Sequence, residues 1–138
     1  CLMRGIEAVK PGARMGAIGA AIQAHAEAER CSVVRDFCGH GLGRVFHDAP
    51  NVVHYAEYKD RWGGVHQAPE TELKEGMFFT IEPMINEGKP DVKLLKDNWT
   101  AVSRDKSLSA QFEHSIGVTK EGAEIFTASP KGLDRPPY

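Results

Sequence analysis

The middle of the chain contains the run Met77-Phe-Phe-Thr-Ile-Glu-Pro-Met-Ile85, which is apolar at almost every position. A run of this composition, preceded by the turn Leu73-Lys-Glu-Gly76, predicts a buried β-strand over 77–85. Toward the C-terminus, turn residues separate further predicted strands at regular spacing, over 91–96, 100–104, 110–119 and 124–127. The last ten residues, 129–138, contain three prolines and are predicted to be an extended cover.

Two helices are predicted on the N-terminal side of these strands. The first ends near Val9, because Pro11-Gly12 breaks it, and the second runs over 13–30. One apolar stripe of the second helix consists of Met15, Ile18, Ile22 and Ala26. Two helices followed by antiparallel strands predict an α+β domain over 1–138, with no internal boundary.

The segments between the second helix and residue 77 carry weaker signals. Residues 32–35 predict a short strand, and 51–55 predict a short strand or a turn. The glycine-rich segment after Phe37 is not expected to be regular unless its backbone passes close to another group. Residues 56–69 are polar and without period, which predicts a loop.

The composition is that of an ordinary globular protein. With 138 residues, 41% of them hydrophobic, the chain can bury a core, and its net charge of −2 gives no field that would attract nucleic acid or an anionic membrane. No apolar run approaches the roughly 18 residues of a membrane span, and three cysteines without a secretory signal favour the cytoplasm. The chain starts at Cys1 with helical spacing already under way, so we expect it to be part of a longer protein.

Two glutamates interrupt predicted strands that are otherwise largely apolar. Glu82 stands in the first run, and Glu113 stands in Phe112-Glu-His-Ser-Ile-Gly-Val118. An isolated buried carboxylate is costly, so each needs a cation, dense hydrogen bonding or an exposed face of the sheet. Alternation places Glu82 on one face with Phe78 and Thr80, and that face is not polar. A metal site and a solvated face of the sheet are both consistent with this pattern.

The glycine-rich segment Gly39-His-Gly-Leu-Gly-Arg-Val-Phe-His47 adds histidine to these carboxylates. Glycine lets a backbone crowd a metal ion or a substrate, and histidine is the commonest metal-binding side chain. The spacing fits neither a dinucleotide fingerprint nor a P-loop, and the chain has no H-E-x-x-H and no paired C-x-x-C. One histidine with two glutamates favours Mn, Fe, Co or Zn, and hence a metal-dependent hydrolase. The remaining histidines are interpreted as packing or surface residues: His25, His54, His66 and His114.

Three ordered blocks of the chain resemble the type I methionine aminopeptidases. They are Cys38-Gly-His-Gly-Leu-Gly-Arg-Val-Phe-His-Asp-Ala-Pro50, Phe79-Thr-Ile-Glu-Pro-Met84 and Ser107-Leu-Ser-Ala-Gln-Phe-Glu-His114. The likeness covers nearly the whole chain and is poorest over 56–72. It implies the C-terminal half of a pita-bread fold, with two helices packed on a curved antiparallel sheet. The implied activity is removal of the N-terminal methionine from nascent proteins whose second residue is small.

The resemblance also implies a role for individual residues. His40, Glu82 and Glu113 match ligands of two divalent metal ions, which could be Co, Mn, Fe or Zn. Glu82 also matches the group that handles protons, and His47 matches a histidine that contacts the substrate near the scissile bond, so these two are the implied catalytic residues. The implied substrate-binding residues are Phe46, His47 and Trp99.

The family's site also uses two aspartates from strands upstream of the matched region. None of the aspartates of this chain lies in that motif, so the chain carries three of the five expected ligands. We therefore expect weak metal binding and no dinuclear chemistry from these 138 residues alone. The complete enzyme is expected to be a monomer that acts on nascent N-termini at the ribosome, with no specific nucleic acid and no membrane partner.

Two alternatives belong to the same fold. One is a non-catalytic module that binds protein or ribosomal partners, which would be favoured by loss of ligands, yet each ligand expected in this half is present. The other is a proline-specific peptidase, which the close match over 107–115 disfavours.

Overall fold

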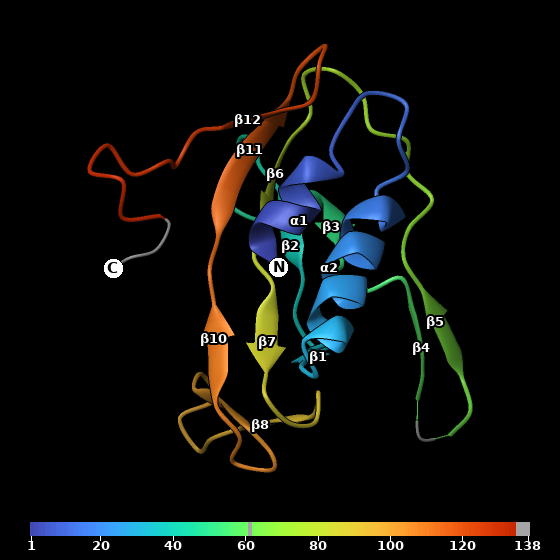
Figure 1. Cartoon of the computed structure of the whole chain (residues 1–138), viewed down its shortest axis with the longest axis vertical. Coiled ribbons are helices and arrows are strands. Elements are labelled where there is room, and N and C mark those ends of the chain that lie inside the picture. Colours follow the sequence, from blue (N-terminus) through green and yellow to red (C-terminus); the bar gives the residue numbers. More distant parts are fainter. Residues whose placement is uncertain (61, 135–138) are drawn as a thin grey trace.

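The computed structural model describes residues 1–60 and 62–134 and places two helices against a set of short strands (Figure 1). The helices are α1 (Leu2–Glu7) and α2 (Gly16–Ala28). The strands are β1 (Ser32–Val33), β2 (Gly39–Gly41), β3 (Asp48–Val52), β4 (Glu57–Lys59), β5 (Val65–Gln67), β6 (Phe78–Ile81), β7 (Met84–Asn86), β8 (Val92–Leu94), β9 (Ala101–Ser103), β10 (Ser109–Gln111), β11 (His114–Val118) and β12 (Ala123–Ile125).

Antiparallel pairing joins the strands into two main sheets. The larger sheet has the order β12-β11-β6-β2-β3, and the smaller has the order β1-β7-β10. Two further hairpins, β4–β5 and β8–β9, lie at the periphery. The predicted α+β class, with two helices and antiparallel strands, is confirmed. No helix in the described part of the chain is long and apolar enough to cross a membrane.

The core lies between α2 and the larger sheet. The four residues of the predicted apolar stripe are 0–1% exposed, although α2 begins three residues later than expected. They pack in one cluster with Phe79 and Ile81 of β6 and Ile116 of β11, which are all fully buried. The helices therefore cover one face of the sheet, as Figure 1 shows.

One small residue of α2 allows a second close contact. A Cβ atom at Gly19 would lie 2.6 Å from the backbone nitrogen of Tyr55, and closer still to the carbonyl oxygen of Tyr55. The helix can therefore rest directly on the backbone that follows β3. This contact is next to His54, whose side chain is 2% exposed.

The single strand predicted over 77–85 is wrong, because the chain forms two strands that belong to different sheets. β6 ends at Ile81 and β7 begins at Met84. Between them, Pro83 has no N–H to donate to a ladder, and the N–H of Glu82 donates to Nε2 of His54 over 3.1 Å. Neither residue 82 nor residue 83 therefore donates a backbone hydrogen bond to a neighbouring strand, and the strand is interrupted there.

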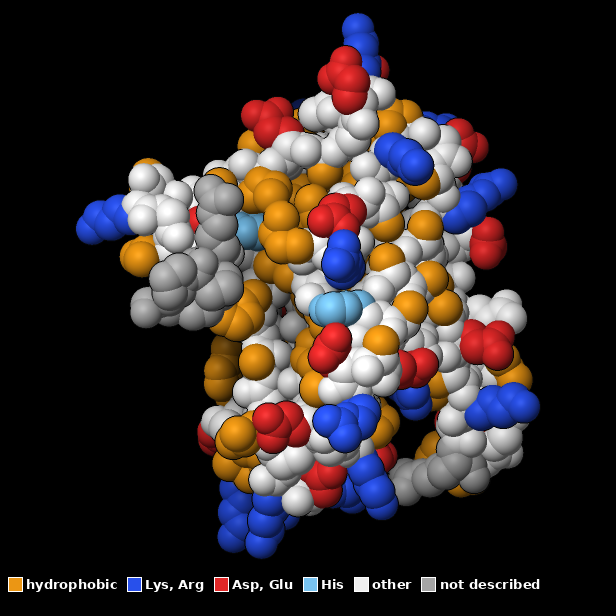
Figure 2. Space-filling model, in the orientation of Figure 1, with side chains coloured by type: hydrophobic (Ala, Val, Ile, Leu, Met, Phe, Trp, Pro, Cys, Tyr) orange, Lys and Arg blue, Asp and Glu red, His pale blue; other side chains and the backbone are white. Residues whose placement is uncertain are grey.

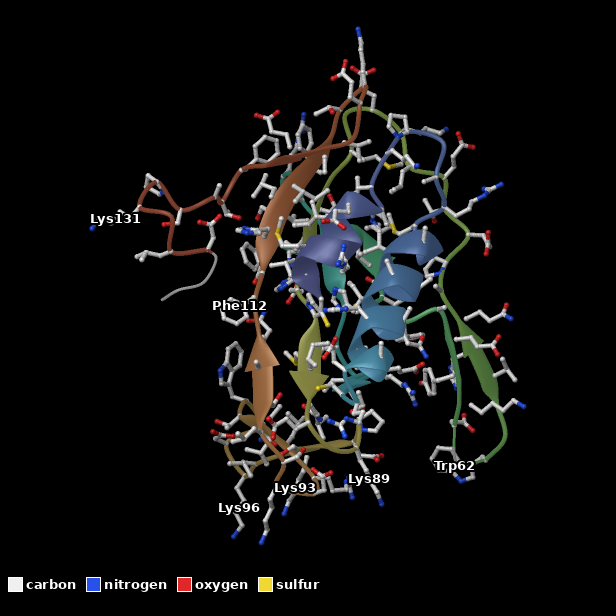
Figure 3. All side chains as sticks on the ribbon, in the orientation of Figure 1. Trp62, Lys89, Lys93, Lys96, Phe112 and Lys131 are labelled. Carbon is white, nitrogen blue, oxygen red and sulfur yellow. The ribbon has the colours of Figure 1, made fainter. Side chains whose placement is uncertain are left out.

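The strand predicted over 110–119 is likewise two strands. β10 pairs with β7 in the smaller sheet, and β11 pairs with β6 in the larger. The break falls at residues 112–113, and Figure 3 labels Phe112 at this point. The chain therefore changes sheets twice, once at each of the two glutamates that interrupt the apolar pattern.

The loop predicted over 56–69 is also wrong, since it contains the β4–β5 hairpin. The Asp60 carboxylate accepts the N–H groups of Trp62 and Gly64 and lies 2.9 Å from Nε2 of His66. The ring of His66 stacks on Tyr58 with centroids 4.6 Å apart. These polar side-chain contacts stabilise the hairpin, although its sequence lacks the apolar alternation that usually predicts a strand. Figure 1 shows the hairpin to the side of the core.

Other expectations differ in detail. The strand or turn expected at 51–55 lies at β3, three residues earlier, and the glycine-rich segment contributes β2, a regular strand. Residues 129–134 form turns, whereas the last four residues of the predicted cover lie outside the described residues. Basic side chains gather at the end of the molecule that carries β8 (Figure 2), where Lys89, Lys93 and Lys96 project outward in Figure 3.

We predict that Gly19→Ala destabilises the protein. Alanine is the better helix former by about 1 kcal/mol, but its methyl group would overlap the backbone of Tyr55, and overpacking costs about 1–3 kcal/mol. Ala20→Gly, at an exposed position of the same helix, measures the helix propensity alone. Urea unfolding followed by circular dichroism checks both, and a Gly19→Ala protein more stable than its parent would contradict the close contact.

We also predict that the stability of the fold depends on pH through His54. Burial lowers the pKa of its imidazole from 6.5 to about 4, so the unfolded chain binds a proton there before the folded chain does. The contribution of His54 to the free energy of unfolding is therefore fully present above pH 6.5. It is lost as the pH drops toward 4, by about 3 kcal/mol in total.

Urea unfolding at pH 7 and pH 4.5 measures this loss. In His54→Gln the amide oxygen can still accept the N–H of Glu82 but does not titrate, so this variant should lose less stability between the two pH values. His25→Gln, on α2, should keep the parent's dependence. Equal losses in all three proteins would show that His54 is not the titrating group.

Candidate functional site

β2 presents His40 toward β6. The pair Gly41–Phe79 sets the antiparallel register, which places His40 opposite Thr80, and the N–H of His40 donates to Oγ1 of Thr80 over 2.9 Å. Nδ1 of the ring lies 3.0 Å from the carbonyl oxygen of Gly41. A carbonyl can only accept, so Nδ1 carries the proton and Nε2 keeps its lone pair. The imidazole is therefore held in the tautomer that binds a metal ion through Nε2.

Glu82 follows directly after β6 and lies near this ring. Its Oε1 is 3.8 Å from Nε2 of His40 and accepts the hydroxyl of Thr80 over 2.8 Å. A separation of 3.8 Å is too long for a hydrogen bond. It is within the span of about 4 Å that two bonds of about 2.0–2.2 Å to a common metal ion allow.

Glu113 enters from the other side of β6. His114 pairs with Ile81, so continuing the antiparallel register by one residue places Glu113 opposite Glu82. Residues opposite each other in an antiparallel pair project from the same face. The register thus places the predicted ligands near one another, with His40 in β2 and with Glu82 and Glu113 just beyond the ends of β6 and β11, although Glu113 itself is exposed.

Electrostatics distinguishes Glu82 from the surrounding acids. Burial raises the pKa of its carboxyl, and the charge of Glu113 raises it further, while the bond from Thr80 and the rings of His40 and His47 act in the opposite direction. Burial, together with the charge of Glu82, likewise raises the pKa of the nearby Cys38 thiol. Burial and the neighbouring Glu113 thus both disfavour the charged form of Glu82, and a cation bound beside it would favour that form.

Two aromatic residues stand beside His40. The ring of His47 lies 4.4 Å from the His40 ring in an edge-on arrangement, and the ring of Phe46 lies 5.4 Å from it. Phe46 is 73% exposed, so most of its face is open. Phe46 and His47 therefore both lie next to the candidate ligand His40.

Trp99 lies elsewhere in the fold. It sits in the turn between β8 and β9, is 87% exposed, and donates its backbone N–H to the carboxylate of Asp97. A cavity of about 490 Å³ adjoins Glu113 between α1, β7 and β10, and it is lined by Leu2, Pro83 and Ile85 among others. Neither Phe46 nor Trp99 lines this cavity.

The candidate metal ligands do not form a compact cluster within residues 1–60 and 62–134. No three His, Cys, Asp or Glu side chains in these ranges converge closely enough to hold a metal ion together. His40 and Glu82 form a close pair, and Glu113 faces them across the register. The donor types, one imidazole nitrogen and carboxylate oxygens, fit a divalent ion of the Mn, Fe, Co or Zn class.

Sequence reasoning missed two residues that contact Glu82. His54 was interpreted as a packing residue, yet its ring accepts the N–H of Glu82. Thr80 was placed on the same face as Glu82 without a function, yet its hydroxyl links Glu82 to His40. The i, i+2 spacing of Thr80 and Glu82 indicates that their side chains share one face of a strand. His54 is 28 residues away from Glu82, and no sequence pattern predicts that contact.

The chain is similar in sequence and structure to proteins of known function. A methionine aminopeptidase from Rickettsia prowazekii is 59% identical over 138 residues, which are 99% of this chain and 50% of that protein. Its crystal structure superposes with a TM-score of 0.81 at 57% identity, over 91% of this chain and 48% of that one. The chain spans about half the length of the curated relatives it matches.

A more distant match supports the same architecture. Prolidase from Pyrococcus furiosus gives a TM-score of 0.56 at 25% identity, over 93% of this chain and 29% of that one. Similarity to both enzymes confirms the predicted pita-bread fold. The sequence pattern of metallopeptidase family M24 matches residues 1–120, which are most of the chain. This range includes His40, Glu82 and Glu113. This chain is a member of metallopeptidase family M24.

Proposed function

We propose that this chain carries the C-terminal part of the catalytic centre of a methionine aminopeptidase. The observation that supports it most directly is the 3.8 Å approach of His40 Nε2 to Glu82 Oε1, with Glu113 opposite Glu82 in register. The same chain is more than half identical to a methionine aminopeptidase, compared with 25% for the prolidase. The reaction is hydrolysis of the first peptide bond of a polypeptide that begins with methionine.

His40, Glu82 and Glu113 would hold the metal in this proposal. A pair of divalent ions would supply Lewis acidity toward the scissile carbonyl and would make water a stronger nucleophile at neutral pH. The tautomer of His40 favours this role, since its Nδ1–H is tied to the carbonyl of Gly41 and its Nε2 is left as the ligand atom.

The protein groups would move the protons. Glu82 is partly buried and its pKa is raised, so its carboxylate can accept a proton from the attacking water and return it to the leaving amine. His47, whose ring lies against His40, would donate a hydrogen bond to the oxyanion of the tetrahedral intermediate. Phe46 and Trp99 would contact the methionine side chain. A small second residue would be required in the substrate.

We further propose that these 138 residues do not complete the site. They supply three side chains that match ligands, and no three donors converge among the described residues. The two aspartate ligands would come from residues outside this chain, consistent with relatives about twice its length. The isolated chain would then bind metal weakly and would not catalyse. The complete enzyme would be a cytoplasmic monomer that acts on nascent N-termini at the ribosome.

This proposal predicts that Glu113→Gln and Glu82→Gln each weaken metal binding. Each change removes a ligand charge, so the loss should exceed the about 10–100-fold that removal of an outer hydrogen-bond partner of a ligand costs. Glu124→Gln, an exposed carboxylate on β12, is the matched control and should bind as the parent does. Isothermal titration with Co²⁺ or Mn²⁺ measures all four proteins.

A second measurement separates an enzyme from a non-catalytic module. Release of methionine from a Met-Ala peptide should be undetectable with the 138 residues alone and should appear in a longer protein that adds the upstream aspartates. Unchanged metal affinity in Glu113→Gln would refute Glu113 as a ligand. Two ions bound per isolated chain would contradict the incomplete site, and a longer protein that binds two ions without releasing methionine would favour the non-catalytic alternative.

A further inference from the structure

Thr80 is a buried polar residue that connects the two closest candidate ligands. It is 1% exposed and lies in β6 between Phe79 and Ile81, which are fully buried. Its Oγ1 accepts the N–H of His40 over 2.9 Å and lies 2.8 Å from Oε1 of Glu82. A third neighbour, the carbonyl oxygen of His40, is 3.5 Å away.

The direction of these hydrogen bonds follows from the chemistry of a hydroxyl. It has one hydrogen to donate and can accept two bonds. The carboxylate of Glu82 is nearer than the carbonyl of His40, and hydrogen bonds to an ionised acceptor are the stronger ones. The hydroxyl therefore accepts from the backbone of His40 and donates to the side chain of Glu82.

The surrounding strands make this contact possible. Thr80 and Glu82 are two residues apart and project from one face, so their side chains are neighbours. On β2, a Cβ atom at Gly39 would lie 3.0 Å from Oγ1 of Thr80 and would overlap the carbonyl oxygen of the same residue. Glycine at this position lets β2 come close enough for His40 to reach the hydroxyl.

We propose that Thr80 is a positioning residue, whose hydroxyl holds the Glu82 carboxylate in the orientation that faces the His40 ring. The inference rests on the proposed metal site. A glutamate side chain has several rotatable bonds, and an unrestrained carboxylate at the end of a strand would populate several orientations. Outer hydrogen bonds of this kind orient metal-ligating carboxylates and contribute to metal affinity.

The test compares two substitutions at Thr80. Thr80→Val keeps the shape and removes the hydroxyl, and should weaken Co²⁺ binding about 10–100-fold. Thr80→Ser keeps the hydroxyl and should stay within about threefold of the parent, because rescue depends on the hydrogen bond and not on the methyl group. Isothermal titration of the 138-residue chain with Co²⁺ gives the affinities, and the visible spectrum of bound Co²⁺ reports the ligand geometry.

Thr119→Val is the matched control for the loss of a threonine hydroxyl. Oγ1 of Thr119 accepts the N–H of Gly122 in the turn before β12, in a different part of the sheet from Glu82. This variant should keep the parent's Co²⁺ affinity, and its melting temperature, measured in EDTA, reports any change in stability separately. If Thr80→Val does not fold, Thr80→Cys replaces it, because a thiol is only a weak donor and should give a similar loss.

Three outcomes would contradict the role of Thr80 or the metal site on which it rests. Parent-like Co²⁺ affinity in a folded Thr80→Val protein would overturn the positioning role and leave the metal site intact. An equal loss in Thr80→Ser would also overturn it, since the hydroxyl would then be irrelevant. A parent chain that binds Co²⁺ no better than Glu82→Gln would overturn the proposed metal site, and the role of Thr80 with it.

Discussion

The register of β6 with its two neighbours decides where every candidate ligand lies. The pair Gly41–Phe79 places His40 beside Thr80 on one side, and the pair His114–Ile81 places Glu113 beside Glu82 on the other. Side chains alternate along a strand. A shift of one residue in either pairing would therefore point a candidate ligand toward the face of the sheet that the helices cover. The burial of Phe79 and Ile81 in the core cluster opposes such a shift, so the core and the candidate site depend on the same alternation.

The two glutamates also shape the fold. At Glu82 the chain leaves the larger sheet for the smaller one, and at Glu113 it returns. Two carboxylates opposite each other at these crossings repel, and partial burial increases the cost of charging Glu82. A sequence selected only for stability would place apolar or oppositely charged residues at this pair. Local conflict of this kind is typical of functional positions.

Much of the fold could be predicted from the pattern of apolar residues. The stripe on α2, the α+β class and the β8–β9 hairpin follow from periodicity and turn residues. The two crossings could not, because an apolar run does not reveal that its hydrogen-bond partners change at Pro83 or Phe112. The β4–β5 hairpin is held by polar contacts around Asp60 that leave no periodic signal. The candidate residues Glu82, Glu113 and His40 stand out in the sequence, whereas the hydrogen bond from Glu82 to His54 required the structure.

The geometry of the donors limits what they can do by themselves. His40 lies in β2, and Glu82 and Glu113 lie just beyond the ends of β6 and β11, so all three would approach a cation from one face of the larger sheet. Zinc takes at least four ligands, and a pair of ions needs more oxygen and nitrogen atoms than these three side chains possess. Thr80 contributes to this group through hydrogen bonds, since its hydroxyl accepts the N–H of His40 and donates to Glu82. In the proposed site, the remaining coordination would come from water, from a substrate or from further protein groups.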